Sequence, residues 1–300
     1  MLLGAIKSLW YYLPFKQYPV FHRLRMGLYH RVMRVLMRRT YGKIVTKKIH
    51  GIRYELDLSE TIEASLYYSG VYEIETLKCL QRHIRPDMNV FEIGANVGSH
   101  SFEIAKCLQA GTGTLYCFEP TEYAFRKLIK NHGLNHFTNI VFEKTALSDR
   151  NETRRITPAS SLDTVAFSAS WDVKNLKSKR HDAQDIAFKT LDAYVQEKQI
   201  AHVDLLKIDV DGYELKVMTG SAKTLARFRP MLIIELSECL LHYVGDRLED
   251  LLNLLERFGY AFQPVYMAAP INRERLLDEI KLRQTLDCLC VCQSPPAPIS

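Results

Sequence analysis

A glycine loop between two apolar runs is the feature that most constrains how this chain can fold. Residues 90–98 read VFEIGANVG and residues 115–119 read LYCFE, and the intervening residues 99–108 have helical spacing. Each apolar run has the length of a buried strand and carries a carboxylate at or near its end. A strand, a glycine turn, a helix and a second strand that ends in an acid form the nucleotide-binding half of a doubly wound α/β sheet.

The glycine spacing and the two acids indicate which nucleotide this loop binds. A dinucleotide-binding loop reads G-x-G-x-x-G and directs a helix N-terminus at a pyrophosphate, whereas three residues separate Gly94 from Gly98 and the loop has no third glycine. Glu92 would repel a pyrophosphate but suits a cationic ligand such as S-adenosylmethionine. Glu119 lies where a carboxylate can accept hydrogen bonds from both ribose hydroxyls. Together these features favour a methyltransferase over a nicotinamide-dependent oxidoreductase, although an ordinary strand-to-helix turn would explain the glycines alone.

The rest of the chain alternates strands and helices in the way that is typical of α/β domains. We expect strands at residues 89–93, 113–118, 140–145, 203–210, 231–236, 261–267 and 287–292, and a hairpin at 49–58. We expect helices at residues 59–84 (broken near Gly70), 122–132, 190–199, 213–225 and 248–258. The run at 203–210 is apolar on both faces, which indicates a central parallel strand.

Changes in composition set the expected domain boundaries. Residues 49–293 are expected to form the catalytic domain, and the Pro- and Ser-containing residues 294–300 a disordered tail. Residues 150–188 interrupt the alternation with a polar and basic sequence. We interpret them as an insert made of a small β-extension and a mobile loop, in a position where substrate specificity could reside.

The positive charge of the chain is confined to its N-terminal segment. Residues 1–50 contain eleven Lys or Arg and no Asp or Glu, whereas the remaining 250 residues contain 29 basic and 34 acidic side chains. Residues 1–48 are therefore expected to be an extension, with a basic amphipathic helix over 21–38. The apolar side of this helix either packs on the catalytic domain or lies on anionic lipid. Aromatic side chains at residues 10–15 favour lipid over nucleic acid, so we expect no nucleic-acid partner.

Cysteine usage and hydropathy indicate a reduced, cytoplasmic protein. The seven cysteines form no C-x-x-C pair, and Cys288, Cys290 and Cys292 alternate as residues on one buried strand face do. Histidines with ligand spacing are missing nearby, so we expect no metal. No run reaches the roughly 18 apolar residues of a membrane span, and the first fifteen residues lack the features of a signal peptide. Any membrane contact would therefore be peripheral, at the inner face, through residues 20–40.

Three segments resemble the FkbM-type family of S-adenosylmethionine-dependent methyltransferases. They are FEIGANVG (91–98), CFEPTEYAF (117–125) and LLKIDVDGYELKVMTGS (205–221), and KIDVDGYE is their most specific part. The weaker segments TALSD, TLD and RPMLIIEL stand in the expected order, so the resemblance spans about residues 72–236. Glu92 and Asp211 depart from the Asp and Glu that the family usually has there. Both exchanges keep the charge and move it by one methylene.

The resemblance implies a seven-stranded, mostly parallel sheet whose last strand is antiparallel. It also implies S-adenosylmethionine as the methyl donor, and a hydroxyl acceptor that is often on a sugar or a glycosylated product. The expected cofactor-binding residues are Glu73, Glu92, Gly94, Asn96, Gly98 and Glu119.

Methylation of a hydroxyl group requires a base or a cation near the acceptor. An alcohol has a pKa far above neutral, so a base must take its proton, or a cation must hold the alkoxide, as the new bond forms. We expect Asp209, at the end of the strand at 203–210, to be this base or to orient the substrate. Lys207 and Glu214 are expected to support Asp209, and Glu235 is a second candidate. The alternatives are a structural ion-pair cluster of Lys207, Asp209 and Glu214, and a helix cap or ion pair at Glu235.

A third class of function is a noncatalytic, membrane-associated binding module that retains the fold. The carboxylates that a catalytic site would need are present at Glu92, Glu119 and Asp209, which argues against a site that has lost its activity.

Overall fold

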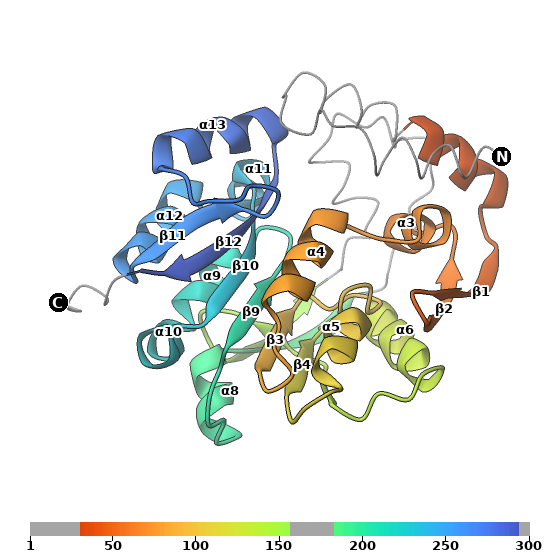
Figure 1. Cartoon of the computed structure of the whole chain (residues 1–300), viewed down its shortest axis with the longest axis horizontal. Helices are drawn as coiled ribbons and strands as arrows, with labels where there is room; N and C mark the ends of the chain where they lie inside the picture. Colours follow the sequence, from red (N-terminus) through yellow and green to blue (C-terminus); the bar gives the residue numbers. More distant parts are fainter. Residues whose placement is uncertain (1–30, 157–182, 294–300) are drawn as a thin grey trace.

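A sheet of seven strands forms the centre of the computed structural model, which describes residues 31–156 and 183–293 (Figure 1). The strand order is β11-β12-β10-β9-β3-β4-β5. The bounds are β3 Asn89–Ile93, β4 Thr114–Phe118, β5 Ile140–Glu143, β9 Leu205–Ile208, β10 Met231–Leu236, β11 Tyr260–Pro264 and β12 Leu286–Cys292. β12 is antiparallel to both of its neighbours, and the other pairs are parallel. The predicted doubly wound, mostly parallel sheet is confirmed.

The strand order reverses at β3, which indicates where a ligand would bind. From β3 the chain continues outward through β4 and β5, and then crosses to the other side of β3 to form β9 and β10. In open α/β sheets, ligands bind outside the carboxyl ends of the strands where the order reverses in this way. We therefore expect a ligand to bind beyond the carboxyl ends of β3 and β9.

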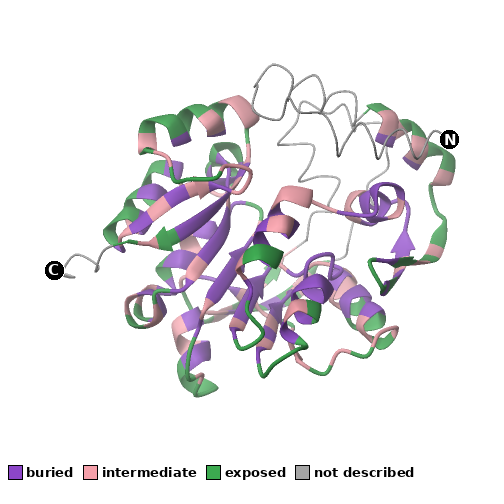
Figure 2. Ribbon diagram, viewed as in Figure 1, coloured by how far each residue is buried: buried purple, intermediate pink, exposed green. Residues whose placement is uncertain are grey.

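Both faces of the sheet are buried beneath helices (Figures 1 and 2). Neighbouring residues of one strand belong to different core clusters, as Val90 and Phe91 do in β3 and Leu205 and Leu206 in β9. The helices are α3 Thr61–Ser69, α4 Ile74–His83, α5 Ser101–Leu108, α6 Glu122–Gly133, α8 Leu191–Glu197, α9 Glu214–Thr219, α10 Ala222–Phe228, α11 Glu238–Tyr243, α12 Leu248–Arg257 and α13 Arg273–Arg283. Because side chains alternate along a strand, an apolar run without polar gaps is what a strand covered on both faces requires.

The single helix expected at 213–225 is wrong, because two helices, α9 and α10, occupy this region. The chain turns between them at Gly220, where an added Cβ would lie 2.0 Å from the carbonyl oxygen of Ser148. α10 then begins with its own cap, since Asp192 accepts hydrogen bonds from the backbone N–H groups of Lys223 and Thr224. Thr190 is the N-cap of α8, and its hydroxyl oxygen accepts a hydrogen bond from the backbone N–H of Ala193.

The N-terminal part of the described chain packs on the domain instead of standing apart from it. The hairpin consists of β1 Ile44–Ile49 and β2 Ile52–Asp57, so the boundary expected after residue 48 falls inside β1. Residues 31–40 are helical, and their buried Met33 and Met37 contact α3. Within the described parts of the chain, no helix has the length and apolar character needed to cross a membrane.

The insert contributes a small second sheet. β6 Ala146–Leu147, β8 Gln184–Lys189 and β7 Glu152–Ile156 pair in the order β6-β8-β7, which is the β-extension expected there. The loop and the tail expected at 157–182 and 294–300 lie outside the described residues.

Candidate active site

The glycine loop after β3 is pressed against the end of β9. Gly94 has a φ of +92°, and a Cβ on it would lie 1.9 Å from the backbone oxygen of Asp209. Gly98 has a φ of +90°, and a Cβ there would lie 2.4 Å from the Phe102 ring. Between them Asn96 also adopts a left-handed conformation, with a φ of +48°. Only glycine fits both ends of this loop, because both need a positive φ and room for a close contact.

Glu119 fastens the glycine loop to the end of β4. Its Oε2 accepts the Asn96 N–H at 3.0 Å, and its Oε1 accepts the N–H and the hydroxyl of Thr121 at 2.8 and 2.6 Å. A carboxylate has about four acceptor positions, so about one remains for a ligand. Burial raises the pKa of Glu119, although the three hydrogen bonds act in the opposite direction. Glu119 therefore already has a structural role, and contact with two ribose hydroxyls would require it to exchange a present partner.

Glu92 lies beneath the loop. Its side chain is buried, and its Oε2 accepts hydrogen bonds from Ser101 Oγ at 2.5 Å and Cys117 Sγ at 3.7 Å. Glu92 is also the register partner of Lys207 in β9. Burial raises the pKa of Glu92 to about 7, although the charge of Lys207 opposes the rise.

Three carboxylates lie close to the Lys207–Asp209 pair and interact with Asp209, and we call Glu73, Asp209, Glu235 and Asp287 the acidic cluster. Lys207 is buried and its Nζ lies 2.8 Å from Asp209 Oδ2. Glu235 in β10 is the register partner of Asp287 in β12, so the antiparallel strand brings a further acid to this edge. Thr285 donates to Glu235 at 2.7 Å, and Thr76 donates to Asp287. Glu73 stands at the N-cap of α4.

The acidic cluster divides into one ionised carboxylate and three that hold protons more tightly. Burial alone would raise the pKa of Asp209, but the Lys207 charge and hydrogen bond outweigh it and lower the pKa. Burial and the neighbouring acids raise the pKa of Glu73 and of Glu235 well above the usual range. Burial also raises the pKa of Asp287, to about 6. Environments that separate the pKa values of neighbouring acids in this way are typical of acid–base sites.

Glu214 has a different position from the one expected of a supporting catalytic residue. Its Oε1 accepts the backbone N–H groups of Val210 and Gly212, at 3.1 and 3.2 Å. It therefore holds the turn after β9, in which Asp211 has a φ of +52°. This contact favours the structural alternative for Glu214, whereas Lys207 and Asp209 do form the expected pair.

Two residues of this region, His100 and Asp287, were not expected from the sequence. His100 is buried behind the glycine loop, with Nε2 3.9 Å from Glu73 Oε2. No motif or spacing distinguishes it from the other histidines. Asp287 had a signal that could have been used, because the antiparallel last strand implied by the resemblance would bring it beside Glu235.

Comparison with known proteins decides the family. Residues 92–262 match the Methyltransferase FkbM domain, which covers more than half of the chain. The chain belongs to this family. It is therefore a methyltransferase-family protein with S-adenosylmethionine as its methyl donor, which settles the choice against a nicotinamide cofactor.

Among curated proteins, the FkbM-family chain is similar to three methyltransferases. The 2-O-methyltransferase NoeI of Sinorhizobium fredii is 26% identical over 188 residues, which are 60% of this chain and 75% of NoeI. The hexuronic acid methyltransferase AglP of Haloferax volcanii is 23% identical over 155 residues, which are 51% of this chain and 58% of AglP. The 31-O-demethyl-FK506 methyltransferase FkbM of Streptomyces tacrolimicus is 28% identical over 174 residues, which are 49% of this chain and 66% of that protein.

Among solved structures, the chain resembles methyltransferase FkbM from Methylobacillus flagellatus, with a TM-score of 0.43 and 14% identity. The match covers 77% of this chain and 48% of that one. A second neighbour is TYW2 of M. jannaschii in complex with AdoMet, with a TM-score of 0.41 and 15% identity, covering 83% of this chain and 86% of that one.

The residues of this FkbM-family site fit a cationic nucleotide. Gly94 and Gly98 leave the loop backbone bare of side chains, which permits close approach of a ligand. Two polar atoms beside the loop, Glu73 Oε2 and His100 Nε2, are buried and have no hydrogen-bond partner among the described residues. The acids around them outnumber the single Lys207. In the described ranges no three His, Cys, Asp or Glu side chains are grouped as metal ligands would be.

Proposed function

We propose that this FkbM-family protein transfers a methyl group from S-adenosylmethionine to a hydroxyl group on a sugar, a glycan or a glycosylated product. Two of the similar curated proteins are named for methylation at a 2-O position and of a hexuronic acid. The observation that carries the proposal for this chain is the Lys207–Asp209 pair at the carboxyl end of β9, beside the glycine loop.

Asp209 is the residue that would accept the proton of the acceptor hydroxyl. Its carboxylate is 25% exposed and its pKa is lowered by the Lys207 charge, whereas burial and the neighbouring acids raise the pKa of Glu235. Lys207 holds Oδ2 of Asp209, and Glu235 also hydrogen-bonds to this carboxylate. A carboxylate has about four acceptor positions, so Asp209 can still accept a hydrogen bond from a hydroxyl. Because the pKa of Asp209 is low, it orients the hydroxyl first and takes the proton only as the new bond forms.

The cofactor supplies an activated methyl group, and the protein supplies position. Gly94, Asn96 and Gly98 would hold the nucleotide against the loop, and Glu119 would bind its ribose. Glu73 would lie near its amino-acid end. Holding two reactants in line accounts for a large share of the rate in such transfers, since it removes the entropy cost of their encounter.

The test is a search for the acceptor with the full chain. Fractions of cell extract and a panel of sugars and glycolipids would be incubated with radiolabelled S-adenosylmethionine, using Asp209→Asn as the control. Label in a hydroxyl-containing product that depends on Asp209 supports the proposal. If S-adenosylhomocysteine binds in calorimetry but no fraction is ever labelled, the noncatalytic binding module gains instead.

We also propose that the basic N-terminal segment contacts the cytoplasmic face of an anionic membrane. Exposed Val35 and Ile44 lie on the same segment as exposed Arg38 and Arg39, and the packing of Met33 and Met37 on α3 leaves these outward side chains available. Each basic residue near an anionic surface contributes about 1 kcal/mol, which salt screens.

Vesicle sedimentation tests the membrane proposal without deleting the packed helix. The variant Arg38→Glu/Arg39→Glu should lose binding to vesicles that contain phosphatidylserine, and high salt should release the unmodified protein. The matched control is Lys223→Glu/Lys281→Glu, which changes two exposed lysines elsewhere. Equal binding of both variants, or no binding of the unmodified protein, would end this proposal.

A further inference from the structure

A buried pair of acceptor atoms lies beside the glycine loop. His100 is 2% exposed, and its Nε2 faces Glu73 Oε2 at 3.9 Å. This distance is too long for a direct hydrogen bond. Neither atom has another partner among the described residues. Buried polar atoms without partners are rare, and each one calls for an explanation such as an absent water, ion or ligand.

The tautomer of His100 determines what this place can bind. The ring of His100 hydrogen-bonds to the backbone of Tyr72, and since Nε2 is unpartnered, Nδ1 makes that bond. Burial, and then the Lys207 charge, lower the pKa of His100 to about 3, so the imidazole is neutral. A neutral imidazole that donates through Nδ1 has a lone pair on Nε2 and can only accept there.

The occupant must therefore donate at least two hydrogen bonds within a small volume. A hydroxyl has one proton to donate and would leave one of the two acceptors unsatisfied, whereas an ammonium has three. A positive charge is also favoured here. Burial and the neighbouring acids raise the pKa of Glu73, so a cation beside it would stabilise the carboxylate form that accepts hydrogen bonds, and Lys207 is already paired with Asp209. The methyl donor carries an ammonium on its amino-acid part, so its chemistry matches the site.

We propose that His100 Nε2 and Glu73 Oε2 together bind the ammonium group of the methyl donor, which makes His100 a cofactor-binding residue. The proposal rests on S-adenosylmethionine as the donor and extends the site to a residue on the far side of the glycine loop. Tyr72, whose ring centroid lies 5.9 Å from that of His100, covers the pair.

A ligand that lacks the amino-acid part can show whether His100 binds the ammonium group or only supports the structure of the glycine loop. Calorimetry would compare S-adenosylhomocysteine with 5′-methylthioadenosine on the full chain and on His100→Phe. Loss of one hydrogen bond to a charged group should weaken S-adenosylhomocysteine binding about 10- to 100-fold. Binding of 5′-methylthioadenosine should stay within about twofold, because it has no ammonium to lose. Parallel weakening of both ligands would show that His100 only shapes the loop.

A double-mutant cycle and a spectroscopic measurement complete the test. Glu73→Gln and His100→Phe should be non-additive for S-adenosylhomocysteine, since both act on one ammonium. The ¹⁵N chemical shift of His100 Nε2 in the unmodified protein should move with S-adenosylhomocysteine and stay unchanged with 5′-methylthioadenosine. If the Nε2 signal does not move when S-adenosylhomocysteine binds, the position between His100 and Glu73 holds a water molecule and not the ammonium group. If the unmodified protein binds neither ligand, the cofactor assignment fails instead.

Discussion

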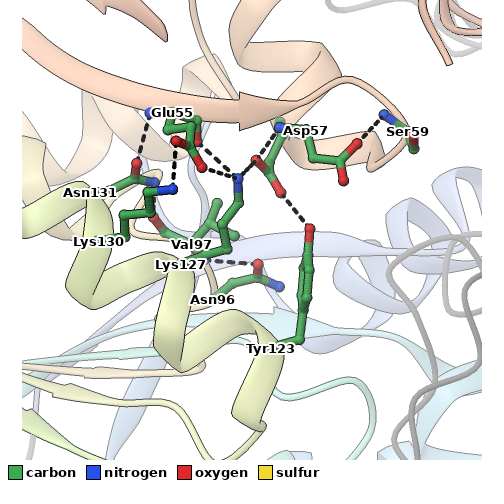
Figure 3. A network of polar contacts seen from close by, with 10 residues as sticks. Glu55, Asp57, Ser59, Asn96, Val97, Tyr123, Lys127, Lys130 and Asn131 are labelled. Atoms are coloured by element: carbon green, nitrogen blue, oxygen red, sulfur yellow. Dashed lines mark hydrogen bonds and ion pairs between the residues drawn. The ribbon is translucent and has the colours of Figure 1, made fainter. Parts of the chain in front are cut away.

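Two clusters of buried charge in this molecule differ in how completely their charges are paired. The first joins β2, α3 and α6 and is shown in Figure 3. There Lys127 lies 3.0 Å from Glu63 and 3.6 Å from Glu55, and Lys130 lies 2.7 Å from Glu55. Tyr123 donates to the other oxygen of Glu63 at 3.2 Å. We call this set the hairpin network.

The acidic cluster has the opposite balance. It sets four carboxylates against one lysine, and two polar atoms at its border lack partners among the described residues. A buried charge is tolerable when it is paired and hydrogen-bonded, and is costly otherwise. The hairpin network meets that condition within the protein. In the acidic cluster, burial raises the pKa of three of the four acids, and their carboxylate forms would meet the condition only with a cationic ligand. This difference indicates that the acidic cluster is the functional one, because its polar groups are not all paired within the protein.

The largest effect is expected at the ionised member of the acidic cluster. Asp209→Asn keeps the shape of the side chain and removes its ability to take a proton. Turnover should fall by roughly 10²–10⁴, while S-adenosylhomocysteine affinity in calorimetry changes little. Glu235→Gln is the matched variant and should cost far less, because the raised pKa of Glu235 disfavours its carboxylate form. A larger loss in Glu235→Gln than in Asp209→Asn would exchange the two roles.

The hairpin network should respond in stability and not in catalysis. Lys127→Met leaves buried Glu63 without its cationic partner, so the free energy of unfolding should fall by about 3 kcal/mol. Lys130→Met removes an ion pair to the same Glu55 from a lysine that is 57% exposed, and should cost less than about 1 kcal/mol. Denaturant titration measures both. Equal losses in the two variants would mean that burial does not decide the strength of this network.

Much of the fold was predictable because the strands are apolar on both faces. The bounds expected for 89–93 and 231–236 agree with β3 and β10 to the residue. The helix expected at 213–225 was wrong because its break depends on contacts that sequence spacing does not contain. Gly220 meets Ser148, and Asp192, from a distant helix, caps α10.

The candidate site was predictable where its residues end parallel strands. Asp209 and Glu235 were found in this way, since the carboxyl ends of such strands meet at one edge. His100 and Asp287 reach the site through the packing of α5 and through an antiparallel pairing, which are tertiary features. The supporting role of Glu214 stays a prediction, and its hydrogen bonds to the backbone amides of a turn were likewise not visible in the sequence.

Glu119 combines features of the two clusters. It has hydrogen-bond partners within the protein, as the hairpin network does, and a predicted ligand, as the acidic cluster does. Glu119→Ala should weaken S-adenosylhomocysteine binding about 10- to 100-fold, and should also lower the melting temperature, because Asn96 and Thr121 lose their acceptor. The control is Glu122→Ala, which removes a half-buried carboxylate of α6 that is paired with Lys144. It should leave affinity unchanged and stability nearly so. Unaltered affinity in Glu119→Ala would remove Glu119 from the cofactor site.

The smallest expected effect is a change in how stability depends on pH. Burial raises the pKa of Glu214 to about 7 from an ordinary value of 4.5. Between these values the folded protein retains a proton that the unfolded chain has lost. The stability that Glu214 contributes is therefore complete below about pH 4.5 and is lost as the pH rises through about 7, at up to roughly 1.4 kcal/mol per pH unit.

Glu214→Gln removes this dependence and keeps the local structure. Its amide oxygen can accept the same N–H groups of Val210 and Gly212 without holding a charge. The variant should be at least as stable as the unmodified protein at pH 8, and its melting temperature should fall less between pH 5.5 and pH 8. Glu274→Gln, at an exposed position of α13, should leave the pH dependence unchanged. Turnover of Glu214→Gln within a few-fold of normal would agree with a turn-holding role, whereas a loss comparable to that of Asp209→Asn would return Glu214 to the catalytic group.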